Sequence, residues 1–265
     1  MSALALLPKP TPPGEGPEDD VHLSLRDHLT ELRKRLKFAL VWLVVGFGAS
    51  YHFSERIFQF LMKPVRAALP VNEQFLFFKS SIEPLFIYLK VGLYAGLFVA
   101  SPMILWQIWA FVAPGLYRKE KKAVVPFVAA ATLFFIGGAA FCYYVILPPA
   151  FQFLIQGAGP EIKPVLMMDE QLGLVMMLLL AFAIIFELPL VLTFLGMLGV
   201  VDHKFLGKYR RHAIVLNVII AAFVTPTGDP FNLALMAVPM MLCYELGVLG
   251  AWIFGKKKPA PETTP

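Results

Sequence analysis

Residues 101–122 read SPMILWQIWAFVAPGLYRKEKK, and this stretch decides the fold class. An apolar run that contains two tryptophans ends at Pro114-Gly115 and passes directly into a basic loop. Such a transition is typical of a membrane helix that leaves the bilayer on its cytoplasmic side. One carboxylate, Glu120, lies among the basic residues of this loop. Two interpretations stay open: Glu120 neutralises its neighbours, or it receives a cationic group from a guest molecule.

The composition extends this interpretation to the whole chain. Of the 265 residues, 58% are hydrophobic and 15% are charged, and the mean hydropathy is +0.70. Soluble domains are about one quarter charged, so an integral membrane protein is predicted. Segments of about 20 apolar residues cross the bilayer as helices, whereas barrel strands would alternate apolar and polar residues. Six segments predict an all-α bundle of six transmembrane helices: 37–54, 84–112, 123–147, 173–199, 213–225 and 231–254.

The distribution of Lys and Arg predicts the orientation of this bundle. Most of them lie in the N-terminal region, in the second-to-third and fourth-to-fifth loops, and at the C-terminus. This asymmetry places both termini in the cytoplasm, and the net charge of +5 marks topology rather than a nucleic-acid partner. Residues 22–254 are predicted to form the membrane domain, with 1–21 and 255–265 as disordered cytoplasmic ends. The two outer loops carry only Arg56, Lys63, Arg66, Lys79 and Lys163.

The outer loops and the fifth segment have unusual lengths. The first loop, about 55–83, combines an amphipathic turn with several phenylalanines, and the second, 148–171, is also long and contains proline. Such loops either cap the outer face or rest on the lipid headgroups. The fifth segment is short and ends at the turn Thr225-Pro-Thr-Gly-Asp-Pro230. It predicts either local thinning of the bilayer or a gap that neighbouring residues fill.

Charged residues also fall inside the apolar segments. Glu187 lies in the fourth segment, two residues before Pro189, and a carboxylate at that depth costs about 2.5–3.5 kcal/mol. A functional group is therefore favoured, with a structural hydrogen bond to another helix as the alternative. For Lys90 a structural role is the better interpretation, whereas for Glu245 packing and function remain open. Cys142 and Cys243 lie in apolar segments and are interpreted as small hydrophobic residues, so neither a disulfide nor a metal site is predicted.

The segment 27–36, DHLTELRKRL, forms the predicted cytoplasmic entry to the first helix. Glu31 and Arg35 are spaced i,i+4 and can pair on the helix surface. A second interpretation is that Glu31 and Glu120, both at the cytoplasmic rim, hold two guanidinium groups through bidentate hydrogen bonds. Lysine reproduces such bonds poorly.

Four stretches together resemble the TatC family, the multi-spanning receptor of the twin-arginine protein translocase. They are DHLTELRKRL at 27–36, the stretch 101–122, FELPLV at 186–191 and TPTGDPFNLALMAVPMMLCYELG at 225–247. The resemblance covers about residues 22–254. It implies a concave, glove-like bundle in the cytoplasmic (inner) membrane with both ends in the cytoplasm. The fifth and sixth helices are expected to be short.

The resemblance also implies roles for individual residues. Glu31 and Glu120 match the acidic positions that receive the paired arginines of a signal peptide. Arg33 and Phe111 match positions needed for transport, and Glu187 matches an intramembrane carboxylate at a docking face. Three further positions are implied to serve structure or transport: Pro64, Pro102 and Tyr143. Two positions at the outer end of the fifth helix, Thr225 and Asp229, are implied to dock the single-helix partners TatA and TatB.

The predicted function is that of a non-enzymatic receptor driven by the proton-motive force. It would bind folded cargo proteins through twin-arginine signal peptides, recruit TatA and TatB-like subunits, and form homo-oligomers. No cofactor is predicted, because the chain has no nucleotide-binding or catalytic motif. The alternative is a proton-coupled transporter of a small solute with Glu187 as the relay. That class would be expected to show inverted repeats, and the two halves of the sequence show no convincing ones.

Overall fold

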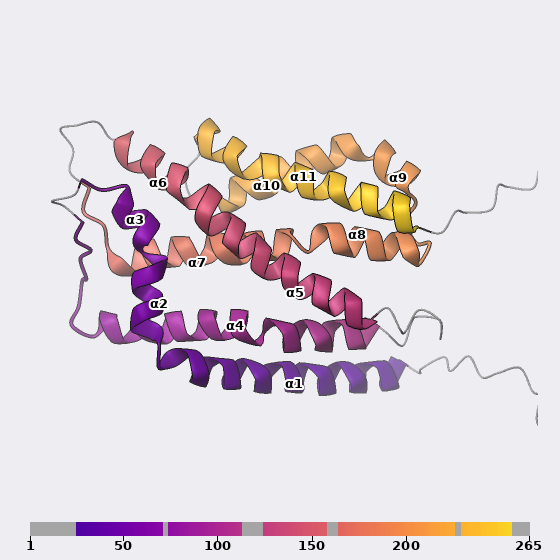
Figure 1. Ribbon diagram of the computed structural model, residues 1–265, viewed down its shortest axis with the longest axis horizontal. Coiled ribbons are helices and arrows are strands. Elements are labelled where there is room, and N and C mark those ends of the chain that lie inside the picture. The colour runs from indigo at the N-terminus through magenta and orange to yellow at the C-terminus, as the bar shows by residue number, and fades with distance from the viewer. Residues whose placement is uncertain (1–24, 71–73, 113–123, 158–163, 226–228, 256–265) are drawn as a thin grey trace, which may run out of the picture.

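The computed structural model describes residues 25–70, 74–112, 124–157, 164–225 and 229–255. Within these ranges the chain is almost entirely helical, and the β-structure consists of an isolated bridge between Phe77 and Met167. The long helices lie side by side along the longest axis of the molecule (Figure 1). The predicted all-α membrane fold is therefore confirmed.

The helices have the following bounds in chain order. They are α1 (Leu25–Tyr51), α2 (Ser54–Leu61), α3 (Lys63–Ala67), α4 (Glu83–Val112), α5 (Val124–Phe141), a π-helical turn (Cys142–Ile146), α6 (Leu147–Gln156), α7 (Met168–Ile185), α8 (Leu188–Met197), α9 (His203–Lys208), α10 (Arg210–Val224) and α11 (Pro230–Phe254).

Four helical stretches of the described chain are long and apolar enough to cross a membrane. A fifth is the pair formed by α1 and the α2–α3 segment, which bends by 85° after Tyr51. The helix α10 has only 15 residues and falls short of that length, so the count of six spans remains a prediction. The expectation of a short last helix is wrong, because α11 has 25 residues. The four stretches are Glu83–Phe111, Val125–Ile155, Met168–Met197 and Pro230–Phe254.

The third span is longer than the sequence predicted. Its expected end lay at residue 147, before Pro148 and Pro149, but the helix continues through the π-helical turn into α6. Proline lacks an amide proton, which would leave two carbonyls of a regular α-helix without donors. After the π-helical turn a new α-helix, α6, begins, and its first turn contains the prolines. The first turn of a helix needs no amide donors, so proline is tolerated there.

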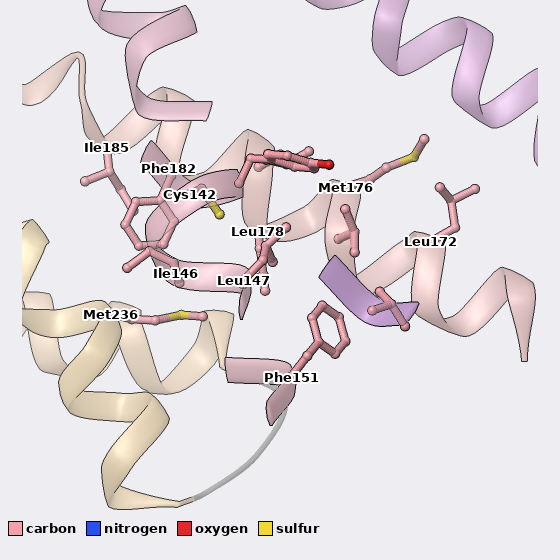
Figure 2. Packing of buried hydrophobic residues seen from close by; sticks show 14 of the residues in the cluster. Cys142, Ile146, Leu147, Phe151, Leu172, Met176, Leu178, Phe182, Ile185 and Met236 are labelled. Carbon is pink, nitrogen blue, oxygen red and sulfur yellow. The ribbon is translucent and has the colours of Figure 1, made fainter. Parts of the chain in front are cut away.

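The main hydrophobic core lies between the π-helical turn with α6, α7 and α11, and buried side chains of α2, α3 and α4 extend it. Figure 2 shows side chains from these helices pointing toward one another around the π-helical turn. Cys142 and Cys243 are buried in this core as free thiols, as the sequence predicted. Fully buried members from three different helices are Ile146, Leu147, Leu172, Phe182 and Met236.

Glycines allow α1 and α4 to pack with their backbones in contact. A Cβ atom on Gly46 would collide with the backbone carbonyl of Gly96, and one on Gly96 would collide with the backbone of Phe47. Small residues at helix crossings are a common means of close packing in membranes. Figure 1 shows the two helices side by side along one edge of the bundle. This contact fixes the register of α1 against α4, and so positions the polar residues near their other ends.

The helices α2 and α3 fold over the end of the bundle where α1 ends and α4 begins, here called the cap end. Three apolar side chains of this segment face inward: Phe58 on α2 is 3% exposed, and Met62, between the two helices, and Val65 on α3 are 0% exposed. Pro64 is buried in the first turn of α3. The hydroxyl of Tyr143 donates a 2.6 Å hydrogen bond to the carbonyl of Phe60, and the two rings stack. Of the two interpretations of the first loop, α2 and α3 therefore favour the cap.

The two long loops meet at the cap end through backbone hydrogen bonds. The amide of Phe77 donates to the carbonyl of Leu166 (2.9 Å), and the amide of Met168 donates to the carbonyl of Phe77 (2.8 Å). Lys79 also forms an ion pair with Glu170. The pKa of Lys79 is raised because the Glu170 carboxylate accepts its hydrogen bond and adds a negative charge nearby. These contacts join the segment before α4 to the start of α7.

Candidate functional site

A polar cluster joins α1 and α4 near the end of the bundle opposite the cap, here called the Arg35 end. Arg35 donates one hydrogen bond to the Oε1 atom of Glu31 and another to the Oε1 atom of Gln107, each 3.2 Å long. The i,i+4 pair that the sequence predicted is thus confirmed. The guanidinium additionally connects the two helices, because Gln107 belongs to α4.

This cluster presents acceptor groups at the surface of the bundle. The side chain of Glu31 is 23% exposed and that of Arg35 is 31% exposed. A carboxylate and a carboxamide oxygen side by side can accept hydrogen bonds from a planar, multi-donor cation. Arg35 itself uses them in this way. The arrangement is therefore chemically suited to a guanidinium group.

Gln107 was missed by the sequence analysis. Its signal was present in the sequence, because it is an uncharged polar residue between Trp106 and Ile108 in an apolar helix. A polar residue at such a position usually has a partner on a neighbouring helix, since hydrocarbon cannot satisfy its hydrogen bonds. Which helix supplies the partner depends on the tertiary arrangement.

The remaining residues expected to bind a signal peptide are only partly brought together. Phe111 lies one helical turn beyond Gln107 on α4 and is half-buried, and Arg33 is exposed on α1. Pro102 lies inside α4. Glu120 lies outside the described residues. The structure thus assembles Glu31 with Arg35 and Gln107.

Glu187 lies at a break between two helices. The helix α7 ends at Ile185 and α8 begins at Leu188, with Pro189 in the first turn of α8. The backbone of Glu187 is satisfied, since its amide donates to Ile184 and its carbonyl accepts from Val191. Its side-chain Oε1 atom is buried and has no hydrogen-bond partner among the described residues. The predicted intramembrane position of Glu187 is therefore a helix break with an unsatisfied carboxylate oxygen.

Thr225 and Asp229 lie at the junction between α10 and α11. Thr225 is buried, and its hydroxyl donates a 2.6 Å hydrogen bond to the carbonyl of Ala221. Asp229 caps the N-terminus of α11, because its carboxylate accepts hydrogen bonds from the backbone amide and the side-chain amide of Asn232. Both residues thus stabilise the ends of the helices on which they lie.

The other two charged residues that the sequence analysis singled out within the spans, Lys90 and Glu245, are paired. Lys90 on α4 forms an ion pair with Asp169 on α7, and Glu245 on α11 forms one with Arg210 on α10 at 2.8 Å. These pairs favour a structural role for both residues. Within the described ranges no group of three His, Cys, Asp or Glu side chains is arranged to hold a metal ion.

Comparisons with known proteins identify the family. The family model described as Sec-independent protein translocase protein (TatC) matches residues 27–239. A Sec-independent protein translocase protein TatC from Desulforapulum autotrophicum is 42% identical over 89% of this chain and 87% of its own length. The protein of the same name from Koribacter versatilis is 38% identical over 89% of this chain and 87% of its own length. This chain belongs to the TatC family.

Solved structures extend the TatC likeness to the fold. A crystal structure of the twin-arginine translocase receptor TatC in DDM has a TM-score of 0.75 and 36% sequence identity, and the match covers 87% of this chain and 100% of that one. A second crystal structure of this TatC receptor gives a TM-score of 0.73. The resemblance that the sequence motifs carried is thus confirmed, and this chain has the fold of TatC.

Proposed function

We propose that this chain is the receptor subunit of a twin-arginine protein translocase. It binds signal peptides with paired arginines and helps folded proteins cross the membrane, using the proton-motive force and no catalysis or cofactor. The observation that carries the proposal is the Glu31–Arg35–Gln107 cluster, found at one end of a TatC fold. The chain lies in the cytoplasmic membrane with both termini in the cytoplasm, and the Arg35 end faces the cytoplasm.

Glu31 and Glu120 receive the two arginines of the signal peptide in this proposal. An arginine remains protonated at any physiological pH and can form two parallel hydrogen bonds with one carboxylate. The contact of Glu31 with Arg35 supports this role, because the carboxylate already accepts a guanidinium hydrogen bond at 3.2 Å. Arg33 and Phe111 complete the binding surface on the same two helices.

Arg35 has a positioning role at this site. Without a guest, its guanidinium balances the charge of Glu31 and holds the carboxylate against α4 through Gln107. A guest arginine can use the remaining acceptor positions of Glu31, because an ionised carboxylate has about four of them. Glu31 thus stays oriented both before and after the signal peptide binds.

A second contact region of the receptor lies within the membrane. The half-buried carboxyl group of Glu187, one oxygen of which has no partner in the described chain, offers a contact to a polar group on an inserted helix, because hydrocarbon provides no alternative partner. The helix of a TatA- or TatB-like subunit, or the apolar part of the signal peptide, is the proposed occupant. The junction at Thr225 and Asp229 docks these single-helix subunits, and copies of the chain associate within the complex.

The test is the replacement of both Glu31 and Glu120 by Gln in the full-length chain. Photocrosslinking to a twin-arginine peptide is expected to be lost while the amount of protein in the membrane is unchanged. Glu55→Gln, at an exposed position of α2 at the cap end, is the matched control and is expected to crosslink normally. A peptide with two lysines should crosslink much more weakly. Undiminished crosslinking of the double variant, or equal binding of the dilysine peptide, would contradict the assignment.

A further inference from the structure

Six apolar side chains are uncovered at the cap end, in a stretch of the chain that precedes and begins α4. Their exposed fractions range from 49% for Phe77 to 71% for Phe75. We call this surface the aromatic rim. It consists of Phe75, Phe77, Phe78, Ile82, Leu85 and Phe86.

The exposure of the rim is not a general property of this loop. Between residues 54 and 67, which precede it, Phe58, Met62 and Val65 are at most 3% exposed, and Phe60, which is 42% exposed, stacks on Tyr143. The same loop therefore buries one set of apolar side chains against the bundle and presents another set to the surroundings. An exposed apolar patch of this kind marks an interaction surface.

The backbone beneath the rim is held by several contacts. Phe77 exchanges two backbone hydrogen bonds with the segment that leads into α7. The amide of Lys79 donates a 2.6 Å hydrogen bond to the carboxylate of Glu83, and the Lys79 ammonium pairs with Glu170. The backbone that carries the rim residues is therefore held in place by hydrogen bonds and by an ion pair.

The rim is continuous with the face of α4 that extends into the membrane. Ile82, Phe86, Leu89 and Leu93 follow one another at spacings of three to four residues, which places them on one face, and all four are exposed. This face belongs to a span of 29 residues. Because nothing in the described chain covers it, lipid is its neighbour along the span, and the rim extends that surface beyond the hydrocarbon.

The length of α4 places the rim at the depth of the lipid headgroups. A helix of 30 residues measures about 45 Å. The hydrocarbon core is about 30 Å thick, and about 40–45 Å with both headgroup layers. The first turn of α4 therefore lies in the headgroup layer at the cap end. Aromatic side chains are enriched at this depth in membrane proteins.

Charged groups next to the rim fit the same depth. The pair of Lys79 and Glu170 is 60% and 59% exposed, and the pair of Lys90 and Asp169 is 51% and 44% exposed. Ion pairs with that exposure require hydration, so this part of the cap does not lie in the hydrocarbon. Aromatic rings beside hydrated charges are typical of the boundary between lipid and water.

We propose that the aromatic rim rests in the headgroup layer of the bilayer at the cap end and anchors the cap to the lipid surface. The occupant of the rim is thus phospholipid rather than a second copy of the chain or another protein. Since α2 and α3 are packed on the bundle, the first loop has both contacts: its first half covers the bundle and its second half binds lipid. This role does not depend on signal-peptide recognition.

Nitroxide spin labels on single introduced cysteines test the proposal in the full-length chain, reconstituted into phosphatidylcholine liposomes. Phe78→Cys and Phe86→Cys report on the rim. Ala67→Cys, exposed on α3, is the control in water, and Leu93→Cys, exposed on the α4 span, is the control in lipid. The native thiols of Cys142 and Cys243 are buried, and the unsubstituted chain, labelled in parallel, gives their background.

Collisions of each label with oxygen and with a water-soluble nickel complex are measured by electron paramagnetic resonance. The ratio of oxygen to nickel collisions at Phe78 and Phe86 is expected to exceed that at Ala67 severalfold and to stay below that at Leu93. Rim ratios equal to that of Ala67 would overturn the proposal. Labels that are immobilised and protected from both reagents would also overturn it, because protein would then cover the rim. Equal thermal unfolding of all four variants verifies the fold.

Discussion

Single side chains determine what the polar sites of this protein can bind. Arg35 keeps the Glu31 carboxylate at the surface of α4, whereas Glu187 has a buried oxygen without a partner in the described chain. The Glu31 carboxylate has a hydrogen-bond partner before a guest molecule binds, whereas the buried oxygen of Glu187 has none in the described chain. We therefore expect substitutions at the two sites to have different effects on the stability of the free protein.

Replacing Glu187 by Gln tests this difference. Glutamine keeps the shape of the side chain and removes the cost of placing a charged group at membrane depth. The temperature of thermal unfolding is expected to be unchanged or raised, while crosslinking to a TatA- or TatB-like subunit and transport of a folded cargo both fall. A clear drop in unfolding temperature would instead assign Glu187 a structural hydrogen bond. Glu55→Gln, at an exposed position of α2, is the control.

The hydroxyl of Tyr143 provides a second test at this scale. Tyr143→Phe removes the 2.6 Å hydrogen bond to the Phe60 carbonyl but keeps the stacked ring. The loss is expected to destabilise the protein by about 1–2 kcal/mol, because the carbonyl loses its donor. Thermal unfolding in detergent measures the effect. Tyr144→Phe, at an exposed neighbouring position, is expected to have no effect, and equal effects of the two variants would contradict the prediction.

The sequence predicted the identity of the polar residues better than their partners. Spacing alone gave the Glu31–Arg35 pair, because both residues lie on one helix. The partner of Lys90 lies 79 positions away at Asp169, and that of Arg35 at Gln107 lies 72 positions away. Such pairs depend on how the helices are arranged, which the periodicity of one segment does not contain.

The packing of helices α1 and α4 depends on the absence of side chains at their crossing. Gly46→Ala is expected to destabilise the protein by about 1–3 kcal/mol, because the new methyl group would collide with the Gly96 carbonyl and backbone cannot move aside cheaply. Gly48→Ala, on the same helix with open space around it, is the matched control. It should leave stability unchanged or raise it slightly, since alanine favours helix. Thermal unfolding compares the two, and equal losses would contradict the close-packing argument.

Helix boundaries could be predicted where a single cause fixes them. The start of the expected segment 84–112 agrees closely with the start of α4 at Glu83, because the apolar composition begins there. The third span was expected to end before Pro148 but continues to Gln156. Its continuation requires the π-helical turn, and that turn is stabilised by tertiary contacts of residues such as Tyr143 and Ile146. Local sequence rules do not include such contacts.

The helices of the described bundle differ widely in length, and α10 remains only a predicted span. The helix α10 has 15 residues and measures about 22 Å, against about 45 Å for the 30 residues of α4. A membrane bundle in which one helix is much shorter than the others is expected to prefer a thinner bilayer, or to thin the bilayer locally. Thermal unfolding in phosphatidylcholine nanodiscs of increasing acyl-chain length should therefore show the highest stability in the shorter chains. A steady rise of stability with thickness would contradict this expectation.

The fold class and the family of the whole molecule could be predicted from the sequence. The composition indicates a helical membrane protein, and four motifs indicate the resemblance to TatC. The arrangement at the cap end could not. The sequence left open whether the first loop covers the bundle or rests on lipid, and the structure divides the loop between inward-facing Met62 and outward-facing Phe78. Apolar composition is similar in both halves, and what distinguishes them is the packing of Phe58, Met62 and Val65 into the hydrophobic core.

The glycine contact has a consequence for biosynthesis. The helix α1 makes its extensive contacts with α4, which is the next long helix to leave the ribosome. The two can therefore enter the bilayer as a finished hairpin while the second half of the chain is still being translated. The receptor surface at Glu31 and Gln107 would then exist on the nascent protein before the intramembrane carboxylate at Glu187 has been synthesised.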